Sequence, residues 1–219
     1  MSSAKFISIE GGEGGGKTTN LELMKEILSQ NNIPFIVTRE PGGTPLAEEL
    51  RALLLENRDE KVNPVAELLM MFAARAQHVE TVIKPALAAG KWVISDRFTD
   101  ASFAYQGGGR NIDWAMIESL EALAIKSFKP DKTFLFDLDP VTGMKRAASR
   151  SEYDRFENEQ MDFFKKVRQA YHRRMDEQPS RFILIDASKP LDEVKLQVKQ
   201  SLELIISSAI NEQKKEFSS

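Results

Sequence analysis

The stretch Gly11-Gly12-Glu13-Gly14-Gly15-Gly16-Lys17-Thr18-Thr19 decides how this chain folds. It fits the pattern G-x-x-x-x-G-K-[ST], whose glycines let backbone N–H groups turn inward without a Cβ in the way. An apolar run, Lys5 to Glu10, precedes it, and a helical pattern follows from Thr19. Inward N–H groups and a helix N-terminus both attract anions. The pattern therefore predicts a loop that binds nucleotide phosphates, with Lys17 on the β- and γ-phosphates and the Thr18 hydroxyl on magnesium.

The composition limits the classes of protein to which this chain can belong. At 219 residues, with 42% hydrophobic and 29% charged residues, the chain is long enough for one domain with a full core. The net charge of −3 gives no general attraction for a nucleic acid polymer. The lack of cysteine excludes disulfides, thiolate metal sites and cysteine nucleophiles. We see neither a targeting segment nor a run of about 18 apolar residues, so we expect a cytoplasmic protein without membrane contact.

Short apolar runs alternate with helical patterns along the chain, which predicts an α/β fold with a mostly parallel sheet. The expected strands are Phe6 to Glu10, Phe35 to Thr38, Trp92 to Asp96, Thr133 to Asp137 and Phe182 to Asp186. Several of these runs end in acidic residues, and ligands of such sheets bind beyond the carboxyl ends of the strands. Polar side chains should therefore gather at that edge.

The expected helices share an amphipathic or apolar pattern and span 18–31, 46–56, 64–89, 112–127, 141–150, 160–178 and 191–210. We expect Pro85 to bend the last turn of the third helix. No linker or repeat divides the chain, so we expect a single domain over residues 1–219 with a frayed polar tail over 211–219.

The phosphate loop alone does not separate kinases from other nucleotide-binding proteins, but the arginines of this chain favour a second phosphorylated ligand. No Asn-Lys-x-Asp segment of guanine-binding GTPases and no G-x-G-x-x-G fingerprint is present. Asp96 at a strand end can hold water on magnesium, and Arg97 beside it can bridge two phosphates. A structural ion pair at the strand end is the alternative. Arg146, Arg150 and Arg155 flank a polar stretch that is either a solvated surface or a lid.

Further motifs occur in a characteristic order after the phosphate loop. They are Thr38-Arg39-Glu40-Pro41-Gly42-Gly43-Thr44, Ala73-Ala74-Arg75, Asp96-Arg97, Tyr105-Gln106-Gly107-Gly108-Gly109-Arg110 and Asp154-Arg155-Phe156-Glu157. With them the chain closely resembles the bacterial thymidylate kinase family over residues 5 to 200. The resemblance implies a P-loop kinase fold with a five-stranded parallel sheet flanked by helices and a short lid over 146–159. It also implies transfer of a phosphoryl group from ATP to dTMP, with Mg²⁺, by a homodimer.

The resemblance assigns the phosphate-binding residues. The whole loop from Gly11 to Thr19 would hold ATP, with Lys17 on the transferred group and Thr18 and Thr19 near magnesium and the α-phosphate. Glu13 would lie on the 3′-hydroxyl side of the acceptor. Arg97, together with Arg51, would clamp the acceptor phosphate, because a planar guanidinium suits bidentate phosphate contact.

The resemblance also assigns the residues that would contact the thymine and the sugar. Arg75 would hydrogen-bond a thymine carbonyl, while Ser102 and Gln106 would lie beside the pyrimidine. Tyr105 would crowd the sugar 2′ position and so disfavour ribonucleotides. The family often has an aromatic residue four positions before Arg75, where this chain has Met71, so either Met71 or Phe72 could contact the base. The alternative is that both are core residues of an apolar helix.

The lid should supply the catalytic arginine, because Gly14 and Gly15 stand where some members of the family place one. Arg150 and Arg155 fit that need. Asp154 and Glu157 would hold the lid in register or face the magnesium water shell, the loop from Asp186 to Pro190 would edge the adenine, and His78 and His172 are expected to be structural. Two alternatives remain at this point. One is a small P-loop kinase with another acceptor, and the other is a regulatory module that binds ATP without an acceptor.

Overall fold

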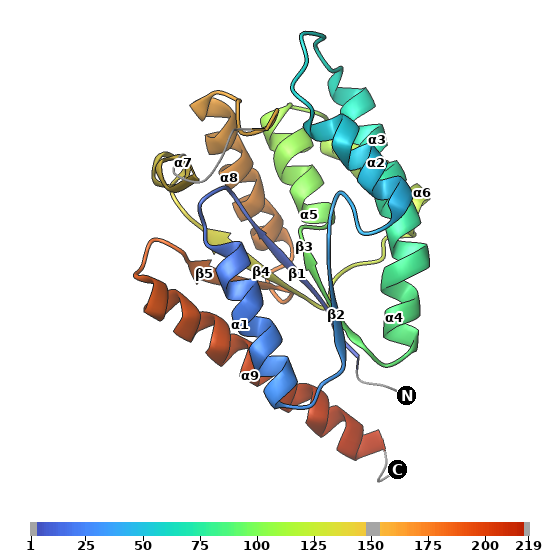
Figure 1. The fold of residues 1–219 in the computed structure, drawn as a ribbon, viewed down its shortest axis with the longest axis vertical. Helices are drawn as coiled ribbons and strands as arrows, with labels where there is room; N and C mark the ends of the chain where they lie inside the picture. The colour runs from blue at the N-terminus through green and yellow to red at the C-terminus, as the bar shows by residue number, and fades with distance from the viewer. Residues whose placement is uncertain (1–3, 148–153, 217–219) are drawn as a thin grey trace.

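Five parallel strands form one sheet in the order β2-β3-β1-β4-β5 (Figure 1). The computed structural model describes residues 4–147 and 154–216, the last four of these by their backbone only. The strands are β1 (Phe6–Gly11), β2 (Phe35–Arg39), β3 (Trp92–Asp96), β4 (Lys132–Asp137) and β5 (Phe182–Asp186). Each predicted strand is present within one residue of its expected ends, and the predicted fold class is confirmed.

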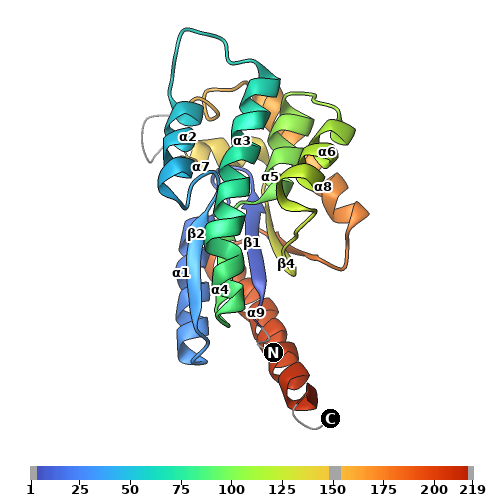
Figure 2. The ribbon, with the colours of Figure 1, turned by 90° about the vertical axis from the view of Figure 1, so that its right-hand side faces the viewer.

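Helices cover both faces of the sheet. On one face α1 (Lys17–Gln30) lies beside α9 (Leu191–Glu216), as Figure 1 shows. The opposite face carries α3 (Pro64–His78), α4 (Lys84–Ala88), α6 (Trp114–Ile125) and α8 (Met161–Glu177), and Figure 2 shows α3 and α4 in front of the sheet. Among the described residues, no helix is both long enough and apolar enough to cross a bilayer.

Side chains of β1 alternate between two packed cores, as a strand buried on both faces requires. Ile7 and Ile9 face a cluster that includes Met24 of α1 and Val198 of α9. Phe6 faces the other side, where it packs with residues of β3 and α6. The same alternation turns the polar Ser8 and Glu10 toward the α3 and α8 side, and both are fully buried.

Capping residues explain where several helices begin. Thr44 caps α2 (Pro45–Leu55) by accepting from Ala47 N, Asn63 caps α3, and Asp113 caps α6. In α2 and α3 a proline follows the cap, where its missing N–H costs no hydrogen bond. The shorter helices are α5 (Thr99–Ser102) and α7 (Pro140–Ala147). A π-helical segment, Phe103–Gly109, continues α5 and was not expected.

Two predicted helices differ from the structure. The helix predicted over 64–89 is divided into α3, a π-helical turn at Val79–Ile83, and α4. Pro85 has no N–H to donate and would crowd the preceding turn, so a wider turn precedes it. The last helix continues beyond its predicted end at Ile210 to Glu216, so residues 211–216 are helical. Residues 148–153 and 217–219 lie outside the described residues.

The fold places the candidate site at one edge of the sheet. The carboxyl ends of parallel strands meet there, and β1 lies between β3 and β4. In β1 and β3, Ile9 pairs with Asp96, so the start of the phosphate loop lies beside the Asp96-Arg97 pair. This edge is where an open α/β sheet binds its ligands.

Candidate active site

The phosphate loop follows β1, and its backbone carbonyl groups bind the side chain of Lys17. Lys17 Nζ donates to the carbonyl oxygens of Gly11 at 3.0 Å and Gly12 at 2.7 Å. Burial lowers the pKa of Lys17, and the nearby Arg97 lowers it further, while Glu13 opposes this effect. Gly16, at φ 80°, starts α1 in a conformation that suits glycine. The loop thus holds the ammonium group of Lys17 beside the N-terminus of α1.

A close approach explains why position 14 is glycine. Gly14 has a φ of 70°, and a Cβ there would clash with the carbonyl group of Gly143 in α7. A Cβ on Gly143 would in turn clash with the Glu13 carbonyl oxygen. The two backbones therefore touch, and an arginine at position 14 does not fit this packing.

A cavity of about 290 Å³ opens beside the loop at the carboxyl edge of the sheet. Most of the residues predicted to bind nucleotides line it together. They are Glu13, Gly14, Gly15, Gly16, Lys17, Thr18, Arg51, Met71, Arg75, Asp96, Arg97, Ser102, Tyr105 and Gln106. The chain brings them there from the phosphate loop, α2, α3, the end of β3, and the segment after it.

Arg97 and Glu13 form an ion pair inside this cavity. The guanidinium of Arg97 also lies over the Tyr105 ring, 4.7 Å from its centroid, and the Tyr105 hydroxyl donates to Glu13 at 3.1 Å. Burial alone would raise the pKa of Glu13, but Lys17 and Arg97 outweigh it and lower that pKa to about 2. The carboxylate is therefore ionised, and its repulsion of a bound phosphate is offset by two cations.

Asp96, at the end of β3, lines the cavity. Its Oδ1 atom is buried and has no hydrogen-bond partner within the described part of the chain. Thr18 lines the same cavity. Among these described residues no group of three or more histidine, cysteine or carboxylate side chains could hold a metal ion by itself. One hydroxyl and one carboxylate suit a hydrated cation whose other ligands are phosphate oxygens.

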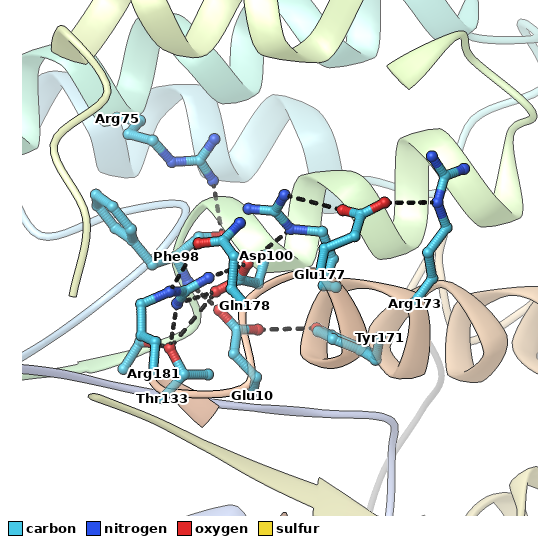
Figure 3. Close-up of polar contacts among 12 residues, drawn as sticks. Glu10, Arg75, Phe98, Asp100, Thr133, Tyr171, Arg173, Glu177, Gln178 and Arg181 are labelled. Carbon is cyan, nitrogen blue, oxygen red and sulfur yellow. Dashed lines mark hydrogen bonds and ion pairs between the residues drawn. The ribbon is translucent and has the colours of Figure 1, made fainter. Parts of the chain in front are cut away.

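Arg75 connects the wall of the cavity to the core. Its Nε donates to Glu40 at 2.6 Å and its Nη1 to Ser102 at 3.0 Å. Its Nη2 donates to the Phe98 carbonyl oxygen at 3.1 Å, as Figure 3 shows. Arg75 is only 3% exposed, so these contacts and the surrounding packing restrict its guanidinium group. Gln106 donates to Glu67 at 2.9 Å, and this contact holds its amide group at the cavity.

The choice between Met71 and Phe72 depends on which way α3 faces. Met71 lines the cavity and packs on the cluster that contains Tyr105 and Phe164. Phe72 is 2% exposed and packs in a core cluster with Phe103. Phe72 does not line the cavity, because one step along a helix turns a side chain by about 100°. Which of the two side chains contacts the base stays a prediction.

Arg155 does not line the cavity as the lid interpretation expects. It forms an ion pair with Glu67 at 2.8 Å and donates to the Leu54 carbonyl oxygen at 2.8 Å. Glu67 is fully buried, and opposite charges attract each other more strongly where little water screens them. Arg150, the other predicted lid arginine, lies outside the described residues.

The remaining predicted residues lie around the cavity. Arg51 lines it and donates to the Pro41 carbonyl oxygen at 2.8 Å. Gly11 and Gly12 border a smaller gap behind the loop, and Thr19 is exposed at the start of α1. Asp154 and Glu157, at the described end of the expected lid, line the cavity.

Both histidines contact protein groups, as expected of structural residues. His78 Nδ1 lies 2.9 Å from Glu40 Oε1, and His172 Nε2 lies 2.9 Å from Asp137 Oδ1. Neither lines the cavity.

Several residues of the site had no role in the sequence interpretation. Glu40 pairs with Arg75, and Glu67 contacts Gln106, Arg110 and Arg155. Its place in the motif Thr38 to Thr44 was the only feature of the sequence that could have pointed to Glu40. A glycine in the middle of a short helix was the signal for Gly143. Phe164 lines the cavity, but no feature of the sequence distinguishes it from the core residues of α8.

Known proteins resemble this chain over most of its length. The family model described as thymidylate kinase matches residues 9–198. A thymidylate kinase of Hahella chejuensis is 52% identical over 202 residues, which are 92% of this chain and 97% of that protein. A thymidylate kinase of Teredinibacter turnerae is 50% identical over 204 residues, covering 93% of this chain and 100% of that protein.

The fold agrees with this similarity. The chain superposes on a crystal structure of thymidylate kinase from Ehrlichia chaffeensis with a TM-score of 0.72 at 35% identity, covering 91% of this chain and 98% of that one. Sequence and fold comparisons thus point to the same proteins as the motifs around the cavity, and the chain belongs to the thymidylate kinase family.

Proposed function

We propose that this kinase holds dTMP and the triphosphate of ATP end to end along the carboxyl edge of its sheet. The enzyme transfers the γ-phosphoryl group of ATP to dTMP and produces ADP and dTDP. One observation carries the arrangement of the two ligands: a single cavity joins Lys17 of the phosphate loop to Arg97 and to the Ser102 wall. A module that only binds ATP needs no such second compartment.

Arg97 and Arg51 would hold the phosphate of dTMP, while the loop amides and Lys17 hold the phosphates of ATP. Both arginines line the cavity beside the loop. A planar guanidinium can donate two parallel hydrogen bonds to a phosphate and so fix its direction. Lys17 would exchange the carbonyl oxygens of Gly11 and Gly12 for phosphate oxygens when ATP binds.

The chemistry then needs alignment and charge neutralisation. An oxygen of the dTMP phosphate attacks the γ-phosphorus, and the bond from that phosphorus to the β–γ bridging oxygen breaks. The electron pair of that bond stays on the β-phosphate of ADP. The attacking oxygen is already anionic, so no general base is required, and none of the histidines lies in the cavity.

The thymine would lie between Arg75 and Met71. Arg75 has donors beyond the three it uses in the protein, and these can reach a thymine carbonyl oxygen. Ser102 and Gln106 would border the pyrimidine, and the Tyr105 ring would lie at the sugar where a 2′-hydroxyl projects. These positions select thymidine over other nucleosides through shape and hydrogen bonding.

Mg²⁺ fits the polar groups beside the loop. The Thr18 hydroxyl would bind the ion directly, and the unpartnered Oδ1 of Asp96 would hold one of its water molecules. When bound, the ion neutralises charge on the β- and γ-phosphate oxygens.

The segment over 146–159 would serve as the lid. Arg146 donates to the Ala187 carbonyl oxygen at 2.9 Å, which places it beside the loop expected at the adenine. Arg155 anchors the other end to Glu67. Arg150 as the arginine on the migrating charge stays a prediction.

A homodimer would cover exposed apolar side chains of α3 and α6, which pack against each other. Leu69 on α3 is 51% exposed and Leu123 on α6 is 80% exposed. Leu69→Glu should then convert a dimer to a monomer in sedimentation equilibrium, whereas Leu204→Glu on α9, also exposed, should not. A wild-type monomer would refute the dimer. A cytoplasmic location also stays a prediction.

An assay of ADP release coupled to a spectroscopic readout tests the function directly. We expect turnover with dTMP, weaker turnover with dUMP, and little with dCMP, AMP or ribothymidine monophosphate. ADP release that does not depend on an acceptor would contradict the end-to-end arrangement.

A further inference from the structure

Glu10 is a buried acid to which neither the motifs nor the proposed mechanism gives a role. It lies in β1, directly before the phosphate loop, and its side chain is fully buried. Its Oε1 accepts the backbone N–H of Phe98 at 2.7 Å, and its Oε2 accepts the hydroxyl of Tyr171 at 2.8 Å (Figure 3). Glu10 thereby connects β1 to α8 and to the turn that carries Arg97.

That turn has an unusual backbone. Arg97 has a φ of 68°, in the left-handed region that residues with a Cβ seldom adopt. Such a conformation persists only where the surroundings impose it, and it is often found at functional sites.

Hydrogen bonds hold the turn on both sides of Arg97. Arg97 N donates to Ile9 O at 2.9 Å, and Ser95 Oγ donates to Arg97 O at 2.7 Å. At Phe98, the N–H donates to Glu10 and the carbonyl oxygen accepts from Arg75 at 3.1 Å. Two of these contacts hold the peptide group between Arg97 and Phe98. Ser95 binds its carbonyl oxygen, and Glu10 alone binds its N–H.

The geometry points to Glu10 as a positioning residue. By binding the Phe98 N–H, its carboxyl group holds Arg97 in the left-handed conformation that directs the guanidinium into the cavity, and Tyr171 keeps Glu10 in place. This inference rests on the proposed role of Arg97 at the acceptor phosphate.

The pKa of Glu10 indicates which side chain can replace it without loss of shape. Burial, followed by the nearby Asp100, raises the pKa of Glu10 to about 8. This shift favours the neutral acid, which glutamine resembles. A glutamine amide has the same shape, offers the same acceptor to Phe98 N and can donate to the Tyr171 oxygen.

Steady-state kinetics of three variants test the inference. Glu10→Ala removes the acceptor and should lower kcat/KM for dTMP by about 10- to 100-fold, because small displacements of a catalytic group have effects of this size. Glu10→Gln should recover most of that loss, and KM for ATP should change by less than about twofold in each variant. Ser8→Ala is the matched control, because Ser8 lies in β1 like Glu10. The substitution removes a buried hydrogen bond of 2.8 Å between Ser8 and Thr133 of β4. It should reduce thermal stability without changing kcat/KM.

A double-mutant cycle with Arg97→Ala separates this inference from the function on which it rests. If Glu10 acts through Arg97, then Glu10→Ala should add less than about twofold to the loss already caused by Arg97→Ala. Full additivity would overturn the role of Glu10 and leave that of Arg97 intact. Normal dTMP kinetics in Arg97→Ala would overturn both.

Tyr171→Phe provides a second arm of the experiment if Glu10→Ala does not fold. It removes only the hydroxyl that holds Glu10 and leaves the packed ring in place. We expect a loss of about 3- to 10-fold in kcat/KM for dTMP, again not additive with Arg97→Ala. An effect on thermal stability alone would overturn the inference.

Discussion

Glu13 of the phosphate loop and Arg97 at the end of β3 form an ion pair across the cavity, although 84 positions separate them in the chain. The parallel pairing of β1 with β3 brings the two together, because Ile9 lies opposite Asp96. In the proposed arrangement of the two nucleotides, this pair would join the donor side of the site to its acceptor side.

The ion pair should make stability depend on pH in the acid range. The pKa of Glu13 is 4.5 in its ordinary environment and about 2 in the folded protein, so the folded state favours the carboxylate. Its contribution, on the order of 2 kcal/mol, is complete above pH 4.5 and is lost as the pH falls toward 2. Urea unfolding of wild type and Glu13→Gln should show a difference that shrinks in this window. The exposed Glu22→Gln is the control, and a difference independent of pH would contradict the assignment.

Lys17→Ala should lower kcat by about 1,000-fold or more, because the transferred group loses its buried cation. Circular dichroism should show a folded protein. Lys25→Ala, on the exposed side of the same helix, should leave kcat unchanged. A near-normal kcat in Lys17→Ala would refute the role of this lysine.

Met71 and Phe72 form a matched pair of neighbours with different environments. Phe72→Ala should cost about 3–5 kcal/mol in the free energy of unfolding, as expected for a fully buried ring. Met71→Ala should cost less stability but weaken dTMP binding by about tenfold. Calorimetry of binding and denaturant titrations measure the two effects. The opposite pattern would mean that Phe72 contacts the base.

Tyr105 should discriminate against ribonucleotides by its bulk. Tyr105→Phe loses only the 3.1 Å hydrogen bond to Glu13 and should keep the ratio of kcat/KM for dTMP over ribothymidine monophosphate within about threefold. Tyr105→Ala opens space beside the sugar and should lower that ratio strongly. If Tyr105→Phe alone abolished the preference, the hydroxyl rather than the ring would be responsible.

Arg155 should act mainly by docking the lid. Arg155→Ala removes the contacts with Glu67 and Leu54, so we expect KM for dTMP to rise by about tenfold and the segment near 154–160 to become more sensitive to proteolysis. Arg58→Ala is the control, since Arg58 also donates to a carbonyl oxygen of α2 but not to Glu67. A fall in kcat with unchanged KM would instead show that Arg155 acts on the transferred group.

Much of the site could be predicted because its chemistry depends on neighbours in sequence. The glycines before Lys17 and the adjacent Asp96 and Arg97 each form a local unit, and the structure places these residues at one cavity. The strands followed from runs of β-branched and aromatic residues. The helix predicted over 64–89 was less accurate, because a π-helical turn is a local response to Pro85 that periodicity does not reveal.

The sequence by itself determined the phosphate loop, the α/β fold and the kinase family, because residue spacing and backbone freedom are properties of short segments. The tertiary structure decided that Met71 and not Phe72 faces the cavity, that Arg155 pairs with Glu67, and that Glu10 reaches Phe98. These contacts join residues far apart in the chain or depend on the rotation of one helix. Their energies arise only when separate elements pack and exclude water, so no short segment contains them.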